Sequence, residues 1–280
     1  MATIFESYNQ TKKQLAAAGI EDSVFEAKQI IKSVTGMTSA QILANYGREL
    51  TEFQEITLKA VIAQRISRYP LQYILGFWDF YTRRFKVGVG ALIPRPDTET
   101  VVEVCLEELK GIKNPEILDL CAGTGCIGIT LACEVEGSSV TAVEKYEQAA
   151  AYLKENATAL APDNTRIITG DVLSGAASDG GYDLIVSNPP YLSARDMKCL
   201  QPELEYEPET ALFGGEDGLD FYRGIAKIYR PSLKSGGALV FEIGAAQAEA
   251  VTGILRSEGF TRIRTVKDYC GNDRAVAARL

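Results

Sequence analysis

The sequence predicts an α/β protein with a seven-stranded, mostly parallel sheet, preceded by an N-terminal helical bundle and a β-hairpin linker. Three observations support this prediction. Apolar residues recur at helical spacing early in the chain, short apolar runs alternate with helical segments from residue 116 onward, and the first of those runs enters a glycine-rich turn. Strands that alternate with helices form parallel sheets whose two faces are covered.

Composition limits both the location and the chemistry of the protein. The chain has 280 residues, 46% of them hydrophobic, and a net charge of −8. No apolar run reaches the length of a membrane span, and the six cysteines form no CxxC pair, so we expect a cytoplasmic protein with free thiols and no membrane partner. Histidine is absent, so any chemistry must use carboxylates, amides, backbone groups or a cofactor. The acidic balance disfavours direct binding of nucleic acid, whose phosphates require basic groups.

Residues 1–75 are predicted to form a helical domain. Ser23-x-x-Glu26 and Thr51-x-x-Gln54 have the pattern of capping boxes, each ahead of apolar residues at helical spacing. Nothing in this region indicates catalysis, so we expect a bundle that packs on the main domain or contacts a partner. Residues 76–95 are the predicted linker, because the aromatic, alternating stretch FWDFYTRRFKVGVG is typical of a β-hairpin.

Residues 96–280 contain the alternating elements. The predicted strands are EILDLC (116–121), SVTAVE (139–144), TRIITG (165–170), YDLIVSN (182–188), GALVFEI (237–243), FTRIRTV (260–266) and AVAARL (275–280). Helices are expected from Asp97 or Thr98, over 126–135, over 147–160 and near 219–234. This order predicts a Rossmann-like sheet, in which ligands bind beyond the carboxyl ends of the strands.

The turn LDLCAGTGCIG (118–128) indicates a nucleoside site. Gly123, Gly125 and Gly128 satisfy G-x-G-x-x-G, and Glu144 ends the next strand about 20 residues on, where a carboxylate accepts hydrogen bonds from ribose hydroxyls. The motif alone fits a dinucleotide, S-adenosylmethionine, or a plain strand-to-helix turn. Asp119 favours S-adenosylmethionine, because an acid is unfavourable beside a pyrophosphate and favourable beside the ammonium of an amino-acid tail.

The motif Asn188-Pro189-Pro190-Tyr191 follows the fourth strand and belongs at the same edge. Two prolines fix the backbone and remove two N–H donors, so the Asn188 side-chain oxygen and the Pro189 carbonyl form a rigid pair of acceptors. Such a pair suits a planar –NH2 group: holding both hydrogens directs the nitrogen lone pair at an electrophile and stabilises the developing positive charge. Tyr191 can cover that group with its ring. The alternative is an ordinary rigid turn.

In these residues the chain resembles the class I S-adenosylmethionine-dependent methyltransferases, and among them the glutamine N5-methyltransferases of peptide chain release factors. The resemblance covers nearly the whole chain. Besides the Asn-Pro-Pro-Tyr motif, which adenine-N6 methyltransferases share, it rests on YPLQYILGFWDFY (69–81), LIPRPDTE (92–99), EYEPETALFGGEDGL (205–219), GGALVFEIG (236–244) and DYCGNDRAV (268–276).

The resemblance implies specific roles. The cofactor would be S-adenosyl-L-methionine, the substrate would be the glutamine of a Gly-Gly-Gln loop in class 1 release factors, and the N-terminal helices would contact the release factor. The implied cofactor-binding residues are Asp119, Cys121, Ala122, Gly123, Thr124, Gly125, Glu144, Asp171, Val172 and Asn188. Asn188, Pro189, Pro190 and Tyr191 would bind the substrate, with Asn188, Pro189 and Tyr191 as the catalytic residues.

Cys121 departs from the family pattern, which has glycine at this position. A side chain is tolerated at a strand end if φ is negative, and cofactor binding would then survive the change. Cys121 and Cys126 as metal ligands are the other interpretation of the loop, but no further soft ligand lies nearby in the sequence, and no metal site is predicted.

Other functions remain as alternatives at this point. A glutamine methyltransferase acting on a ribosomal protein would share the same core, whereas an adenine-N6 nucleic-acid methyltransferase is disfavoured by the acidic charge. A nucleoside-binding regulator without catalysis is disfavoured by the intact Asn188 and Tyr191. A nicotinamide enzyme lacks support, because no residue here resembles an acid or base for hydride transfer.

Overall fold

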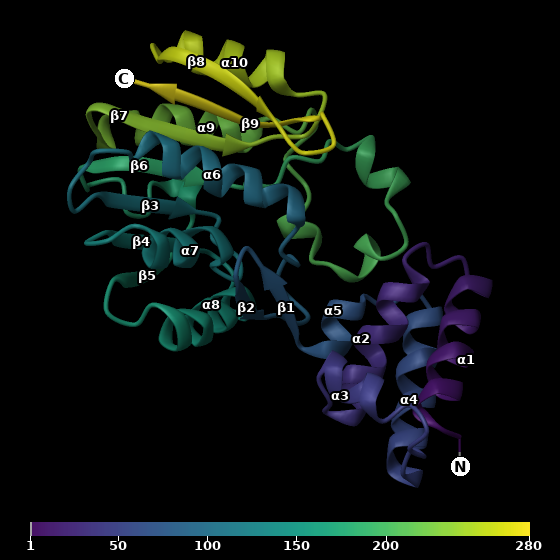
Figure 1. Cartoon of the computed structure of the whole chain (residues 1–280). Coiled ribbons are helices and arrows are strands. Elements are labelled where there is room, and N and C mark those ends of the chain that lie inside the picture. Colours follow the sequence, from purple (N-terminus) through teal and green to yellow (C-terminus); the bar gives the residue numbers. More distant parts are fainter. Residues whose placement is uncertain (1) are drawn as a thin grey trace. The chain divides into compact units, whose positions relative to one another are not determined.

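The computed structural model describes residues 2–280, which divide between Gly76 and Phe77 into two compact units. The first unit is helical, and its helices are α1 (Ile4–Ala17), α2 (Ser23–Thr35), α3 (Ser39–Ala44), α4 (Glu52–Ile66) and α5 (Leu71–Leu75) (Figure 1). Its core includes Leu15, Ile30 and Ile31. Across residues 2–280, none of the helices has both the length and the apolar character that crossing a membrane requires.

The two predicted capping boxes in this unit have different outcomes. The box at Thr51 is confirmed, because its side chain accepts from the Gln54 N–H and the Gln54 side chain accepts from the Thr51 N–H. The box at Ser23 is wrong: α2 begins at Ser23 itself and no side chain caps it. Glu26 instead forms an ion pair with the buried Arg65 of α4, at 2.7 Å. Because its carboxylate is paired with Arg65, Glu26 does not cap the start of α2.

The second unit begins with an antiparallel hairpin, β1 (Phe77–Phe80) and β2 (Arg83–Lys86), and continues as a seven-stranded sheet of order β5-β4-β3-β6-β7-β9-β8. The strands are β3 (Glu116–Leu120), β4 (Ser139–Glu144), β5 (Thr165–Thr169), β6 (Tyr182–Ser187), β7 (Leu233–Glu242), β8 (Thr261–Lys267) and β9 (Asp273–Arg279). All neighbours pair in parallel except β9, which is antiparallel to β7 and β8. The predicted fold class is confirmed.

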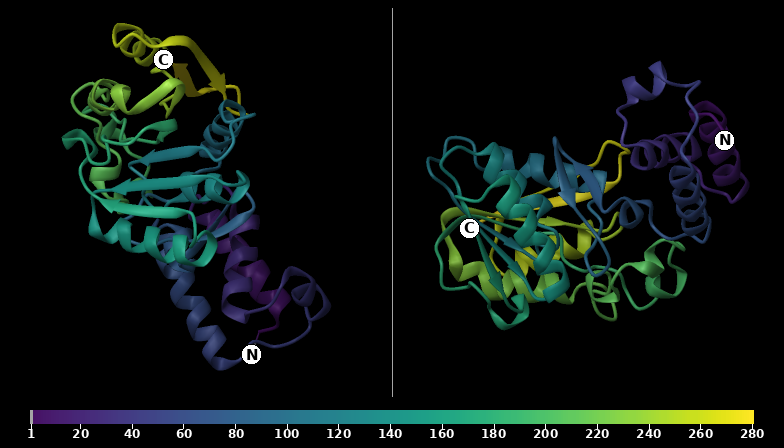
Figure 2. Two further views of the ribbon diagram at one scale, coloured as in Figure 1. Left: turned by 90° about the vertical axis from the view of Figure 1, so that its left-hand side faces the viewer. Right: turned by 90° about the horizontal axis from the view of Figure 1, so that it is seen from below.

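Helices cover both faces of this sheet (Figure 2). One core joins the sheet to α6 (Glu99–Glu108), α7 (Cys126–Glu134), α8 (Glu147–Leu160) and the hairpin. The other joins it to α9 (Asp220–Tyr229) and α10 (Ala248–Ser257), a helix that the sequence analysis did not anticipate. Alternate residues of a strand point to opposite faces, so Ile117 enters the first core and Leu118 the second.

Strand register brings the carboxyl ends of four strands, and the predicted site residues that follow them, to one edge of the sheet. Leu120 pairs with Val143 of β4 and with Ser187 of β6, and Ser187 pairs with Phe241 of β7. The Ser187 hydroxyl also donates to the Leu120 carbonyl at 2.7 Å, which fastens β3 to β6 at this edge. The glycine turn, Glu144, Asn188 and Glu242 therefore lie at the carboxyl ends of four neighbouring strands.

Candidate active site

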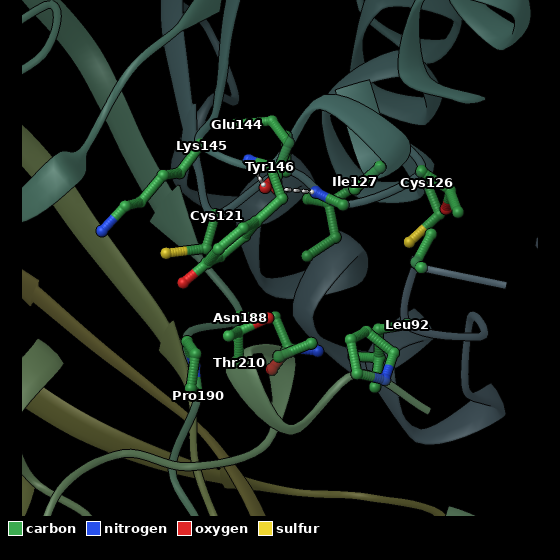
Figure 3. Close-up of a pocket in the computed structure, with 18 of the residues that line it drawn as sticks. Leu92, Cys121, Cys126, Ile127, Glu144, Lys145, Tyr146, Asn188, Pro190 and Thr210 are labelled. Carbon is green, nitrogen blue, oxygen red and sulfur yellow. Dashed lines mark hydrogen bonds between the residues drawn. The ribbon is translucent and has the colours of Figure 1, made fainter. Parts of the chain in front are cut away.

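A cavity lies beyond the carboxyl edge of the sheet and collects most of the predicted cofactor residues (Figure 3). The predicted residues that line it are Cys121, Ala122, Gly123, Thr124, Glu144, Asp171, Val172, Asn188 and Pro190. Asp119, Gly125, Pro189 and Tyr191 are not among the lining residues. The site is thus assembled from three strand ends and the turn that follows β3.

The two glycines of the turn have different surroundings. Gly123 has φ +58, and a Cβ placed there would meet no atom within 4 Å, so its backbone borders open space. Gly125 has φ +83 and caps the start of α7; a Cβ there would lie 2.4 Å from Leu153 and 2.6 Å from Ile129. Gly123 therefore leaves backbone accessible to a ligand, whereas Gly125 lets the helix pack.

Glu144 holds the turn against the next strand. Its Oε2 accepts from the Gly123 N–H at 2.8 Å and its Oε1 accepts from the Tyr146 N–H at 2.9 Å. The residue is 6% exposed, yet it lines the cavity. A carboxylate has about four acceptor positions, so two remain for the hydroxyls of a ligand.

Cys121 adopts the left-handed conformation, with φ +59. The condition of a negative φ is not met, because the chain turns sharply between the end of β3 and Gly123. Its side chain borders the cavity and packs against the core on the α9 side of the sheet. A left-handed residue other than glycine is strained by roughly 1–3 kcal/mol, which gives a physical reason for the glycine of the family pattern.

Asp119 lies beneath the turn rather than in the cavity. It is fully buried, and its Oδ2 accepts from the Gly128 N–H in α7 at 2.8 Å. Its Oδ1 is buried without a hydrogen-bond partner among residues 2–280. Burial raises the pKa of Asp119 to about 7. The carboxyl thus positions α7 relative to β3.

Asp171, which follows β5, also lines the cavity. Its Oδ2 accepts from Lys145 Nζ at 2.8 Å, and its Oδ1 accepts from the Leu173 N–H at 2.8 Å. The hydrogen bond from Lys145 is the main cause that lowers the pKa of Asp171. Val172 is buried and faces the same cavity. A flat apolar surface beside a fixed acceptor suits an aromatic base.

A second cavity adjoins the first and shares four lining residues with it. Tyr191, Asp97 and Glu242 line it, and Leu92, Arg95, Asn188 and Ala211 line both cavities. Gln247 donates to the Tyr191 carbonyl at 3.0 Å and so holds the turn. Burial raises the pKa of Tyr191 to about 12, so its hydroxyl stays protonated. Asn188 is therefore at the boundary between two binding spaces.

Two chain segments complete the walls, and the sequence analysis gave them no role. Residues 90–95 line the first cavity, and so do Pro208, Thr210 and Ala211 of the segment 208–211. They are joined through the buried Glu207, which accepts from the Ile93 N–H at 3.0 Å and forms an ion pair with Arg95. Lys145, Tyr146, Leu173 and Phe221 also line the cavity. The family motifs LIPRPDTE and EPETALFGGEDGL were the available signal, because they contain the two joined segments.

Comparison with known proteins agrees with this architecture. Residues 6–76 match the PrmC N-terminal domain and residues 97–202 match the methyltransferase small domain. The release factor glutamine methyltransferase of Fusobacterium nucleatum is 38% identical over 97% of this chain and 77% of the relative. That of Geobacter sulfurreducens is 37% identical over 99% of this chain and 97% of the relative. The chain belongs to this methyltransferase family.

A solved structure is also similar over a shorter stretch. It is the release factor-specific protein-(glutamine-N5) methyltransferase of Alicyclobacillus acidocaldarius, 31% identical, covering 70% of this chain and 98% of that chain with a TM-score of 0.44.

Methyltransferases of this type use S-adenosylmethionine as the methyl donor, and the residues present fit it. Gly123 borders open space, Glu144 has acceptor positions for ribose hydroxyls, and Val172 offers an apolar surface for adenine. When bound, the cofactor supplies an electrophilic sulfonium methyl group.

Proposed function

We propose that this protein methylates the side-chain amide nitrogen of the glutamine in the Gly-Gly-Gln motif of class 1 peptide chain release factors. One observation carries the proposal: Asn188 lines both the cavity of the nucleoside-type residues and the adjoining cavity of Tyr191. A group held by Asn188 is thus next to the cofactor space and still open to a second ligand. Methyl transfer between two bound molecules requires this adjacency.

The chemistry of the turn supports an amide as the acceptor. The Asn188 side-chain oxygen and the Pro189 carbonyl would accept the two hydrogens of the –NH2 group, and the partly buried Tyr191 would cover its plane. An amide nitrogen is a poor nucleophile because its lone pair is delocalised, as in the peptide bond. Holding both hydrogens concentrates electron density on the nitrogen as it attacks, which lowers the barrier without a prior base.

The same proposal assigns parts of the chain. Residues 1–75 would be the helical substrate-recognition domain, residues 76–95 the hairpin linker and residues 96–280 the methyltransferase domain. Several apolar side chains of the first unit are exposed, among them Phe53 and Ile56 of α4, as expected of a protein-binding surface. We propose a cytoplasmic location and no direct contact with nucleic acid or membrane, in keeping with six free cysteines and the net charge of −8.

The test is intact-mass measurement of a release factor after incubation with the protein and S-adenosylmethionine. We expect one added methyl group on the wild-type factor and none when the glutamine of its Gly-Gly-Gln motif is replaced by alanine. Asn188→Ala should lower kcat by at least about a hundredfold, the usual loss when a transition-state hydrogen-bond acceptor or donor is removed. Glu136→Gln, at an exposed turn, is the matched control and should leave the rate unchanged.

Parallel samples separate the competing substrates. Equal methylation of the wild-type factor and of the variant with alanine in place of the glutamine would refute the proposal. Methyl transfer to a ribosomal protein in preference to the factor would also refute it. Salt-sensitive transfer to an adenine-containing oligonucleotide would point instead to a nucleic-acid substrate.

A further inference from the structure

Glu242 is a buried carboxyl at the wall of the second cavity. It ends β7, next to the β6 end that precedes Asn188, and it is 1% exposed. Its Oε2 is fully buried and accepts no hydrogen bond from any of residues 2–280. A buried acceptor left unpaired is unfavourable, and a ligand that donates to it would remove that cost.

Nearby cations are occupied elsewhere. Arg274 pairs with Asp97 at 3.1 Å and with Asp268 at 3.2 Å, and it also donates to the Ile243 carbonyl at 3.3 Å. Arg95 pairs with Glu207. The charged and titratable groups that face Glu242 are Arg95, Asp97, Cys126, Tyr191, Tyr222 and Arg274. None of these residues forms a hydrogen bond or ion pair with the Glu242 Oε2.

The Glu242 carboxyl group has an unusual protonation equilibrium. Burial raises its pKa to about 7, while the side chain of Thr98 and the charges of Arg274 and Arg95 oppose the shift and Asp97 adds to it. A carboxyl group whose pKa is near 7 can both accept and release a proton at neutral pH. Because the chain has no histidine, few other side chains can do so.

We propose that Glu242 is a further catalytic residue of the methyl transfer: once the substrate nitrogen held at Asn188 has gained the methyl group, the Glu242 carboxylate takes up the proton that this nitrogen loses. The proposal rests on the proposed function and deepens it. It assigns to Glu242 the substrate-side cavity and an acceptor role, whereas Asn188 and Pro189 orient the amide.

The proton balance is simple. When the nitrogen lone pair forms a bond to the methyl carbon, the bond from that carbon to the donor sulfur would break and its electron pair would stay on sulfur. The amide nitrogen then carries a positive charge and still has two hydrogens. One N–H bond then breaks, its electron pair returns to nitrogen and restores amide resonance, and the proton passes to Glu242 Oε2. The neutral carboxylic acid that results is the form favoured by burial, and it returns the proton to water when the product leaves.

Glu242→Gln tests this role with little change of shape. We expect kcat for release-factor methylation to fall at least about tenfold, the lower end of general acid–base effects, while KM for the factor changes less. In the wild type, kcat should decline as the pH falls below about 7, because the protonated carboxyl cannot accept a proton. This decline should be absent in Glu242→Gln.

Further measurements separate catalysis from structure. Affinity for S-adenosylhomocysteine by calorimetry and the midpoint of thermal unfolding should not fall in Glu242→Gln. Glu242→Met, of similar volume and without an acceptor, should show the same kinetic loss. Glu205→Gln, at an exposed position outside both cavities, is the control.

Two results would overturn the inference. One is a kcat for Glu242→Gln within about twofold of the wild type. The other is a lower kcat in Glu242→Gln that still declines below about pH 7, or that is matched by an equal loss of affinity for S-adenosylhomocysteine. Wild-type methylation of the factor tests the proposed function separately, because it is measured in the same samples without reference to the variants.

Discussion

The backbone N–H of Gly123 donates to Glu144 Oε2 at 2.8 Å, which joins the turn after β3 to the end of β4. The carboxylate is oriented by this bond and by the one from the Tyr146 N–H before any ligand arrives. Backbone donors thus set the position of the acceptor that a ribose would meet. An acceptor that is already in place loses little entropy when the ligand binds.

Glu144→Ala should therefore weaken cofactor binding strongly. It removes the hydrogen bonds of a charged acceptor to the ligand, each worth about 1.5–3 kcal/mol, and it also frees the turn. We expect the dissociation constant for S-adenosylhomocysteine to rise by at least about tenfold in calorimetry. Glu136→Gln is the control for loss of a surface carboxylate. Unchanged binding in Glu144→Ala would contradict the assigned role.

Cys121 allows a second prediction from backbone conformation. Because its φ is +59, Cys121→Gly should relieve strain, although glycine adds freedom to the unfolded chain; the net change in the free energy of unfolding should stay within about 1 kcal/mol. Cys121→Val places a β-branched residue in the left-handed region and should cost at least about 2 kcal/mol. Urea denaturation measures both. Equal stability of the two variants would mean that the left-handed turn does not constrain this position.

Much of the fold follows from local pattern, which explains why the sequence predicts it. The central strands β3, β4, β6 and β7 contain short apolar runs bounded by turn residues, and α8 spans the predicted range of 147–160. The failures come from distant partners. Glu26 is part of an ion pair with Arg65, which is 39 residues away, so a local capping rule could not anticipate its role.

The candidate site divides in the same way. Glu144 and Asn188 are strand ends, and the carboxyl-edge rule is enough to bring them together. Asp119 belongs to the binding motif, but it is part of β3, and the alternation of side chains along the strand directs it toward α7. There it accepts a hydrogen bond from the Gly128 N–H. The 208–211 wall cannot be derived from local pattern, because a single buried residue, Glu207, holds it to a segment more than 100 residues away.

The Arg95–Glu207 ion pair should contribute to stability more than an exposed pair of the same chemistry. Glu207 is buried, so removal of Arg95 leaves its charge with only the Ile93 N–H. A double-mutant cycle with Arg95→Met and Glu207→Gln should give a coupling energy of about 1–3 kcal/mol. The exposed Arg84–Asp79 pair, at 2.8 Å, is the control and should give less than about 1 kcal/mol. Similar coupling in the two cycles would show that the link does not depend on burial.

Asp119 makes the last prediction, because its raised pKa links folding to pH. The folded-state pKa of about 7 lies above the ordinary value of 3.8, so the folded protein binds more protons than the unfolded chain between these values. The penalty for the buried charge is absent at low pH, grows as the pH rises through this window and is complete above about 7. Asp119→Asn keeps an oxygen that can accept from the Gly128 N–H and removes the charge. Its stability relative to the wild type should therefore improve by about 2–4 kcal/mol between pH 4 and pH 8, as urea denaturation at several pH values would measure. Asp163→Asn, the same change at an exposed turn, corrects for the loss of one negative charge. A difference between Asp119→Asn and wild type that stays constant with pH would mean that this carboxyl ionises as easily in the folded protein as in the unfolded chain.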